Sequence, residues 1–360
     1  MQFLANGKDQ HPPHLHFESD RGDIIDTRLF RLLRALRDTG TLKLAVNQVE
    51  MSYRHAWDML KQASNVLGSP LVRMERGKGA QLTTLGEKLL WAEQRSDASL
   101  FPQLENVASE LNLEIVRARA ESHLVLRLHA SHGYAVEKLP QLMANHGRAT
   151  MDLQYMSSVD ALASMCRGQC DLAGFHVPLG KIGRGLWEHY ARWITPRQAT
   201  VIRLVIRTQG IIVAPGNPKG IGSIADLVRA DVKFVHRQRG SGTRILLDGL
   251  LRAAGIDPAR VNGYGTGEFT HAAVGAFVSS GIVDAAFGVE PAARQFKLDF
   301  IPIARERYML ACRNESLEQA PIQELISLLR GSALREIIGP VPGYELDDPG
   351  AVAEVGDIIP

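Results

Sequence analysis

The sequence predicts an α/β protein with an added helical domain: an N-terminal winged helix-turn-helix, a linker helix and a C-terminal domain of two α/β lobes. Three observations predict this fold class. Short helical patterns with capping residues and a basic hairpin come first, and apolar runs that alternate with helices follow them. The length of 360 residues is also enough for about two to three domains.

Composition excludes several classes of protein. Hydrophobic residues make up 45% of the chain and charged residues 22%, which is typical of a folded globular protein and excludes disorder, collagen and a disulfide scaffold. The formal charge of +2, from 41 basic and 39 acidic residues, names no partner. Three cysteines favour a reducing compartment, and no apolar run approaches the roughly 20 residues that span a bilayer. We therefore expect a cytoplasmic protein without a membrane segment.

Changes of pattern divide the chain into five expected segments. The first stretch mixes His, Pro, Asp and Gly without periodicity; three histidines there are a weak candidate for metal binding, and a mobile tail is the better interpretation. The segments are a tail over 1–25, a winged helix-turn-helix over 26–84, a linker or dimerisation helix over 85–120, an anion-binding effector domain over 121–314, and a C-terminal helix with an extended acidic tail over 315–360.

Three short helices are expected between residues 26 and 68. Leucines recur at helical spacing from Leu29 to Leu36, and Gly40 ends that helix. Thr41 and Ser52 are placed to cap the two helices that follow. The next stretch, PLVRMERGKGAQLTTLGEKLL, predicts a two-stranded wing and then a long helix from Thr84 towards Ala120, interrupted at Pro102.

This arrangement predicts DNA binding. A recognition helix reads base edges from its N-terminal turn, where Arg54 has the two donors that suit a guanine edge. The wing carries a compact positive charge suited to phosphates or the minor groove. The expected DNA-binding residues are Ser52, Tyr53, Arg54, His55 and Lys61 on the helix, with Arg73, Arg76 and Lys78 in the wing.

Strand and helix patterns alternate from His123 onward. LVLRLHA, MDLQYM and DLAGFHV form a first set, and IIVAPG, VKFVHRQ, DAAFGV and FIPIARERYMLAC form a second. Two lobes of similar size are the simplest arrangement. In such lobes ligands bind beyond the carboxyl ends of strands, where helix N-termini present free N–H groups to an anion.

Polar and small residues follow several of these strands and predict an oxyanion site. The segment from Arg239 to Arg244 is the strongest candidate, because two glycines allow close backbone approach while hydroxyls and arginines supply donors. For His176 a structural role is at least as favoured, and Ser157–Ser158 also fits a simple helix cap. The expected ligand-binding residues are Ser131, His132, Ser157, Ser158, His176, Arg239, Gly240, Ser241, Gly242, Thr243, Arg244 and Thr270.

The sequence gives little support for nucleotide binding, catalysis or metal binding. The Gly-Ser-Gly-Thr segment lacks the Gly-Lys-Ser/Thr ending of a nucleotide P-loop. Catalytic triads, paired carboxylates and metal-ligand spacing do not rise above chance, so we expect neither an enzyme nor a bound metal or cofactor. Cys166 and Cys170 lie four residues apart near the end of a predicted helix, and burial is the default expectation for both.

Two stretches carry a family resemblance. SYRHAWDMLKQASNVLGSPLV with RGKGAQLTTLGEKLL resembles the winged helix of ModE-type molybdate-responsive regulators, related to the LysR-type domain. CDLAGFHVP, RQRGSGTRILLDGLL and GEFTHAAVGAFVSSGIVDAAFGVEPAA resemble the type II periplasmic-binding-protein fold of molybdate-binding-like domains. The resemblance implies that Trp57 is buried, that two lobes close on molybdate or tungstate, and that IIVAPG and RYMLAC mark the hinge crossings. The small β-barrel sensor of many ModE-type regulators is not evident in this sequence.

The sequence-based interpretation is a cytoplasmic, dimeric DNA-binding transcriptional regulator that responds to an oxyanion, molybdate or tungstate first. One alternative is the same architecture sensing an organic or cofactor-derived anion, since two arginines exceed what a small tetrahedral oxyanion needs. The other is an enzyme on the two-lobed fold that uses its helix-turn-helix to dock a partner.

Overall fold

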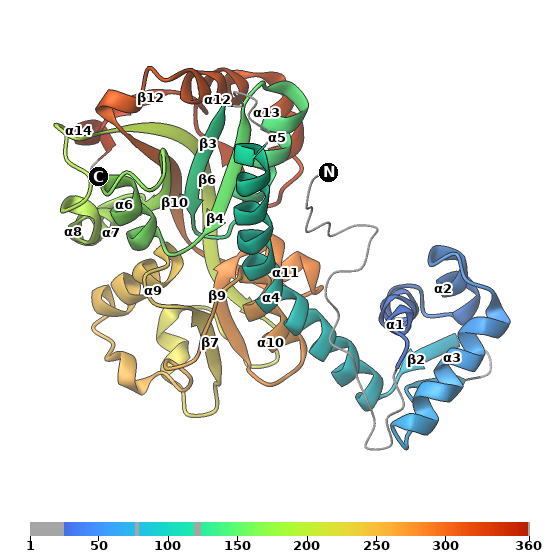
Figure 1. Ribbon diagram of the computed structural model, residues 1–360. Coiled ribbons are helices and arrows are strands. Elements are labelled where there is room, and N and C mark those ends of the chain that lie inside the picture. Colours follow the sequence, from blue (N-terminus) through green and yellow to red (C-terminus); the bar gives the residue numbers. More distant parts are fainter. Residues whose placement is uncertain (1–24, 76–78, 119–123, 359–360) are drawn as a thin grey trace. The chain divides into compact units, whose positions relative to one another are not determined.

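The predicted winged helix, linker helix and two α/β lobes are all present in the computed structural model (Figure 1). The structure describes residues 25–75, 79–118 and 124–358. The chain divides into two compact units between Ala98 and Ser99, inside helix α4 (Thr84–Ala118). Helix α4 continues through Pro102, so the predicted interruption there is wrong. A proline removes one backbone hydrogen bond from a helix, and the remaining bonds of this long helix suffice.

The N-terminal unit is built as its capping residues predict. The hydroxyl of Thr41 accepts a hydrogen bond from the backbone N–H of Leu44, and that of Ser52 accepts one from His55. Gly40 has a φ of 70°, the left-handed conformation in which helices commonly end. The elements are α1 (Arg28–Thr39), α2 (Leu42–Gln48), α3 (Tyr53–Val66), and the wing strands β1 (Val72–Glu75) and β2 (Gly79–Leu82).

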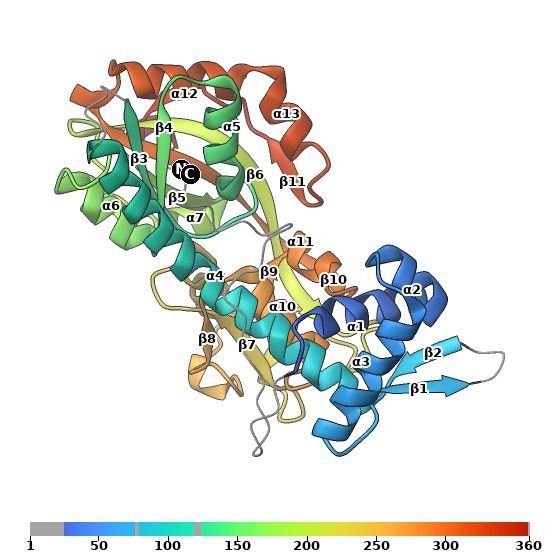
Figure 2. The ribbon, with the colours of Figure 1, turned by 45° about the vertical axis from the view of Figure 1, so that its right-hand side comes forward.

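The second unit is organised around two long antiparallel strands, β6 (Ala199–Val213) and β10 (Asp299–Arg313), which run through both lobes (Figure 2). The sheet order is β4-β3-β5-β10-β6-β9-β7-β8. The predicted runs IIVAPG and RYMLAC therefore lie on the two strands that connect the lobes. One buried apolar cluster extends through both lobes, from Phe175 in the first to Phe287 in the second.

The remaining elements are distributed over the two lobes. Lobe I contains β3 (Val125–Ala130), α5 (Leu139–His146), β4 (Thr150–Tyr155), α6 (Ser158–Cys166), β5 (Leu172–Pro178), α7 (Lys181–Leu186) and α8 (Glu188–Ala191). Lobe II contains β7 (Phe234–Arg237), α9 (Gly242–Ala253), β8 (Gly267–Glu268), α10 (His271–Ser279), β9 (Ala285–Val289) and α11 (Glu290–Gln295). Short 3-10 helices span Val136–Lys138, Ile224–Val228, Pro258–Arg260 and Asn314–Ser316.

The C-terminal segment is part of lobe I, which corrects the expectation of an extended acidic tail. After α12 (Ala320–Arg330) and α13 (Ser332–Ile338), strands β11 (Tyr344–Leu346) and β12 (Val352–Glu354) both pair with β6, and α14 (Val355–Ile358) follows. Its acidic side chains have partners on β10: Glu345 pairs with Arg305, and Asp347 pairs with Arg307. Cross-strand pairing of this kind is not encoded in local periodicity.

The second half of α4 is attached to the edge of the lobe I sheet (Figure 1). The side-chain amide of Asn106 donates to the backbone carbonyl of Tyr155 at 3.0 Å and accepts from its N–H at 2.6 Å. Strand β4 is the edge strand, and Asn106 thus satisfies the backbone groups that a further strand would otherwise pair.

Candidate functional site

Several strand ends converge where the two lobes meet. Strands β3, β4 and β5 are parallel, so the residues that follow them lie at the same edge of the sheet. Ser131 and His132 follow β3, and Ser157 and Ser158 follow β4. All four side chains are buried. The predicted polar junctions of lobe I therefore do lie side by side, and their role in binding remains a prediction.

The N-terminus of α9 in lobe II packs directly on these residues. A Cβ at Gly240 would lie 2.9 Å from the Ser157 hydroxyl oxygen, and one at Gly242 would lie 1.6 Å from Cδ2 of His176. Gly240 also has a φ of +79°. Only glycine allows this approach, so the two glycines singled out in the sequence set how closely the lobes meet.

Of the two arginines in the predicted site, one has other partners and the other is exposed. Arg244 donates from Nε to the Asp248 carboxylate at 2.8 Å and lies over the Tyr264 ring. Arg239 is exposed. These two arginines do not form the predicted clamp, because Arg244 is held by Asp248 and Tyr264 while Arg239 faces solvent.

The predicted hydroxyls are also engaged. The Ser241 hydroxyl caps α9 by accepting from the backbone N–H of Arg244, and it donates to the carbonyl of Gln238. The Thr243 hydroxyl accepts from the Gln209 side chain at 3.0 Å, which leaves its own proton available to a ligand. Thr270 caps α10 by accepting from the N–H of Ala273.

Two other arginines, Arg207 on β6 and Arg237 at the end of β7, supply the buried positive charge. Each is 1% exposed. Arg207 donates from Nε to the Glu306 carboxylate at 2.6 Å and lies 3.4 Å from both ring nitrogens of His176. Nη2 of Arg237 is buried without a hydrogen-bond partner among the described residues. The feature of the sequence that could have identified these two arginines is the presence of cationic residues within two apolar strands, VIRLVIRTQG and VKFVHRQ.

Three buried histidines surround these arginines and remain neutral. Burial and the charges of Arg237 and Arg207 lower the pKa of His132 to about 3, and the same causes hold the pKa values of His176 and His271 well below their usual range. Nδ1 of His132 and both ring nitrogens of His271 have no partner among the described residues. A neutral imidazole keeps one N–H donor.

The cluster has an excess of positive charge. Burial, and then the neighbouring Arg207, lower the pKa of Arg237 to about 9, so it stays protonated at neutral pH. Glu306 is the carboxylate that contacts Arg207. We call Arg207, Arg237, His132, His176 and His271 with the α9 N-terminus the interlobe cluster. Buried charges without partners are costly, and an anion would satisfy their free N–H groups.

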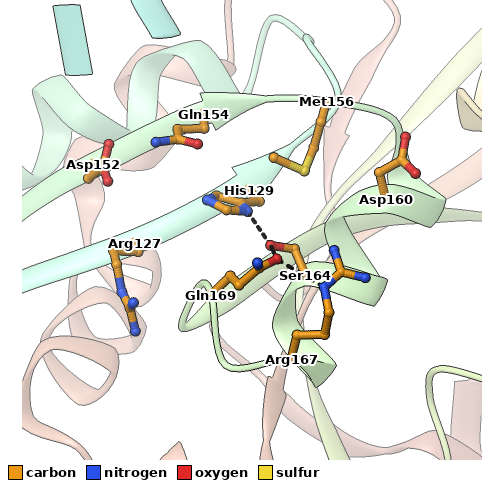
Figure 3. Close-up of a pocket in the computed structure, with 9 residues that line it drawn as sticks. All are labelled: Arg127, His129, Asp152, Gln154, Met156, Asp160, Ser164, Arg167 and Gln169. Carbon is orange, nitrogen blue, oxygen red and sulfur yellow. Dashed lines mark hydrogen bonds between the residues drawn. The ribbon is translucent and has the colours of Figure 1, made fainter. Parts of the chain in front are cut away.

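A separate cavity of about 530 Å³ lies on lobe I (Figure 3). In this cavity the His129 ring points at the Ser164 hydroxyl, 2.8 Å away. Its charged side chains have partners: Arg127 pairs with Asp171, and Asp160 accepts from Ser157. It lacks the unpaired donors of the interlobe cluster and is the weaker candidate. Its lining residues are Arg127, His129, Asp152, Gln154, Met156, Asp160, Ser164, Arg167 and Gln169.

The candidate DNA-binding face lies on α3. Ser52, Arg54, His55 and Lys61 are exposed, as is Arg73 on β1, whereas Arg76 and Lys78 lie outside the described residues. Trp57 is 46% exposed, so its predicted burial is wrong. The apolar face of α3 is formed by Ala56, Met59, Leu60 and Ala63, which leaves Trp57 on the outward side with Tyr53.

The structure places two of the cysteines and shows how possible metal ligands are distributed over the described residues. Cys170 is buried but Cys166 is exposed, because α6 ends at Cys166 and the chain turns at Gly168 before Cys170. No group of three or more His, Cys, Asp or Glu side chains within residues 25–75, 79–118 and 124–358 is placed to hold a metal ion. None of the helices in those ranges combines the length and apolar character needed to cross a membrane.

Comparison with known proteins identifies the two-lobed unit. The model of the PBP superfamily domain matches residues 139–330, more than half of the chain. The chain belongs to the PBP superfamily. The predicted resemblance of the lobes to a binding protein is confirmed at this level. The match includes β4 to β10 and every residue of the interlobe cluster except His132.

Curated relatives match parts of the chain. The uncharacterized protein YvgK of Bacillus subtilis (strain 168) is 36% identical over 176 residues, 48% of this chain and 57% of that protein. The molybdenum-pterin-binding protein MopB of Rhodobacter capsulatus is 34% identical over 108 residues, 29% of this chain and 39% of that protein. The transcriptional regulator ModE of Haemophilus influenzae (strain ATCC 51907 / DSM 11121 / KW20 / Rd) is 33% identical over 70 residues, 18% of this chain and 28% of that protein. The chain thus spans little more than half of the first of these relatives and less of the others.

Among solved structures, an H2O2-bound mutant of OxyR from Corynebacterium glutamicum aligns over 88% of this chain and 94% of its own. The TM-score is 0.46 and the sequence identity 16%.

Proposed function

We propose that this protein is a DNA-binding transcriptional regulator whose PBP-superfamily domain binds an anion between its two lobes. One observation carries the proposal: the buried arginines and histidines of the interlobe cluster have N–H groups without partners, and they meet the N-terminus of α9. Donors and helix ends arranged in this way favour an anion. The exposed basic residues at the start of α3 supply the contact with DNA.

The name of one relative mentions molybdenum, and on that ground we take molybdate, with its analogue tungstate, as the first candidate anion. MopB is called molybdenum-pterin-binding, and ModE is called a transcriptional regulator. An organic or cofactor-derived anion is the second candidate, and a specific feature favours it: Glu306 and Gln209 place acceptors, which a fully deprotonated oxyanion cannot satisfy, beside the donors.

The attachment of α4 offers a route from ligand to DNA. The His132 ring, in the interlobe cluster, lies 5.0 Å from the Tyr155 ring, and Tyr155 holds Asn106 of α4 by two backbone hydrogen bonds. Helix α4 also contributes residues up to Ala98 to the winged-helix unit. An anion that repositions His132 would thereby bias α4, and with it the DNA-binding unit.

We also propose that α4 pairs with a second copy of the chain. Leu100, Val107 and Leu111 are exposed on this helix, at spacings of seven and four residues that place them on one helix face. A helix of another chain would cover this apolar stripe. Dimers address two DNA half-sites, which agrees with the regulator proposal.

The test uses the full chain and DNA from upstream of its own gene. Native mass spectrometry identifies an anion retained by the purified protein, and calorimetry with molybdate, tungstate, sulfate and phosphate ranks affinities. Fluorescence anisotropy of labelled DNA, with and without the retained anion, measures regulation, and light scattering gives the oligomeric state. A chain that binds its upstream DNA no more tightly than unrelated DNA of the same length contradicts the regulator proposal.

A further inference from the structure

Two acceptor atoms lie buried among the donors of the interlobe cluster. Oε2 of Glu306 and Oε1 of Gln209 have no hydrogen-bond partner among the described residues. Both side chains are 0% exposed. Burial without partners is unfavourable for acceptors as well as for donors, so these two atoms require an explanation of their own.

The contacts of Glu306 and Gln209 fix which of their atoms are free. Oε1 of Glu306 accepts from Nε of Arg207 at 2.6 Å and from Nε2 of Gln209 at 2.7 Å. The same Gln209 nitrogen donates to the Thr243 hydroxyl at the start of α9. The free oxygens therefore belong to side chains tied to both lobes, and rotating either amide or carboxylate would break bonds already made.

These acceptors belong to the same site as the donors. Glu306 and Arg207 are cross-strand partners at the crossing between the lobes, and Tyr308, two residues along β10, packs against the ring of His176. The charge of Glu306 also acts on the protonation of Arg237. A group bound by Arg237 and the histidines would thus lie close to a carboxylate oxygen.

The charges of the cluster suit a singly charged group. Arg207 and Arg237 carry one positive charge each, Glu306 carries one negative charge, and the histidines are neutral. Glu137 lies 3.7 Å from Nε2 of His132 and pairs with Lys138 at 3.0 Å, so these two opposite charges leave the balance unchanged. One positive charge therefore remains for a ligand.

We infer that the interlobe cluster selects an anion that carries a hydrogen-bond donor of its own, such as a protonated phosphate or a hydroxycarboxylate, over a fully deprotonated oxyanion. The inference rests on the proposed anion-binding function. Arg237 and the histidines bind the anionic oxygens, while Glu306 Oε2 and Gln209 Oε1 accept from the ligand's O–H. Sulfate or molybdate presents only acceptors near neutral pH, so it faces an unpaired carboxylate oxygen in a buried site.

Two matched ligand pairs test this selection on the unaltered full chain by calorimetry near neutral pH. Phosphate, which near neutral pH is a mixture of singly and doubly charged forms that both carry an O–H group, is compared with sulfate and molybdate, and glycolate with acetate. We expect at least one donor-bearing probe to bind about tenfold or more tightly than its analogue, since an unpaired buried acceptor costs at least that much. The two arms also distinguish an inorganic from an organic ligand. Equal or tighter binding of the analogue in both pairs overturns the inference.

The substitution Glu306→Gln supplies the second readout, because it keeps the shape and replaces Oε2 or Oε1 with a donor. We expect the preference for the donor-bearing probe to fall about tenfold and sulfate to gain affinity. If a folded variant keeps the preference for the donor-bearing probe, Glu306 does not select the ligand and the inference is wrong. That result would not contradict the proposed anion site. If none of the anions binds the parent chain, or if Arg237→Gln alters none of their affinities, the proposed site itself is wrong.

Discussion

Arg237 combines charge, burial and an unpartnered Nη2, which makes it the most unfavourable side chain of the interlobe cluster without an anion. Folding lowers its pKa to about 9, so the protonated side chain penalises the folded state at every pH below that value. The penalty diminishes only as pH rises above about 9, towards the usual pKa of arginine. At neutral pH it is therefore fully present.

Replacement of this residue should affect stability and binding in opposite directions. We expect Arg237→Gln to raise the free energy of unfolding of the anion-free chain, because it removes a buried unpaired charge. Anion affinity should fall by about tenfold or more, because charge-assisted hydrogen bonds are lost. Thermal melts with and without phosphate measure both effects. The exposed neighbour is the control, and Arg239→Gln should change neither quantity.

Arg54 tests the DNA-binding face at the level of one side chain. It is exposed in the first turn of α3. We expect Arg54→Ala to weaken binding to the cognate site by about 1 to 3 kcal/mol and to leave other sequences little affected, as the loss of a bidentate base contact would. Anisotropy titrations on both DNAs measure the difference. Equal weakening on all sequences would instead indicate a phosphate contact.

At the scale of elements, the position of the α9 N-terminus depends on its close packing against lobe I. Gly242 lies in the first turn of α9, where alanine would ordinarily stabilise a helix by up to about 1 kcal/mol. Here the added Cβ would lie 1.6 Å from Cδ2 of His176. The local preference and the tertiary contact therefore predict opposite signs.

We expect the tertiary contact to dominate in Gly242→Ala. Overpacking costs about 1 to 3 kcal/mol, which should appear as lower stability and weaker anion binding because the lobes cannot approach as closely. Melting and calorimetry measure the two changes. Gly265→Ala is the matched control, since a Cβ there has no atom within 4 Å. A variant at 242 that is more stable than the parent would show that this approach of the lobes is not maintained in solution.

At the scale of the whole molecule, the proposed response to an anion would depend on the connection from lobe I to α4. That connection includes the two hydrogen bonds between Asn106 and the backbone of Tyr155. We expect Asn106→Ala to lower the free energy of unfolding by about 1 kcal/mol for each hydrogen bond lost. The variant should also reduce the effect of the anion on DNA affinity while leaving anion affinity nearly unchanged. Gln103→Ala, whose side chain bonds only within α4, serves as the control. DNA titrations with and without the anion measure this effect. If Asn106→Ala responds to the anion as the parent and the control do, the proposed route is wrong.

Local sequence was enough to predict the helices of the winged unit, their caps at Thr41 and Ser52, and most strands of the lobes. Each depends on hydrogen bonds, periodicity or steric freedom within a few residues.

Tertiary structure alone decided which charges lie together. Arg207 and Arg237 meet the histidines because β6 passes from one lobe to the other and β7 ends at Arg237. Arg244, in contrast, turns to Asp248, and Trp57 faces outward. The C-terminal strands likewise find β6 only through long-range pairing. Local patterns specify an element and its faces, but which side chains become neighbours depends on the register and packing of segments far apart in the chain.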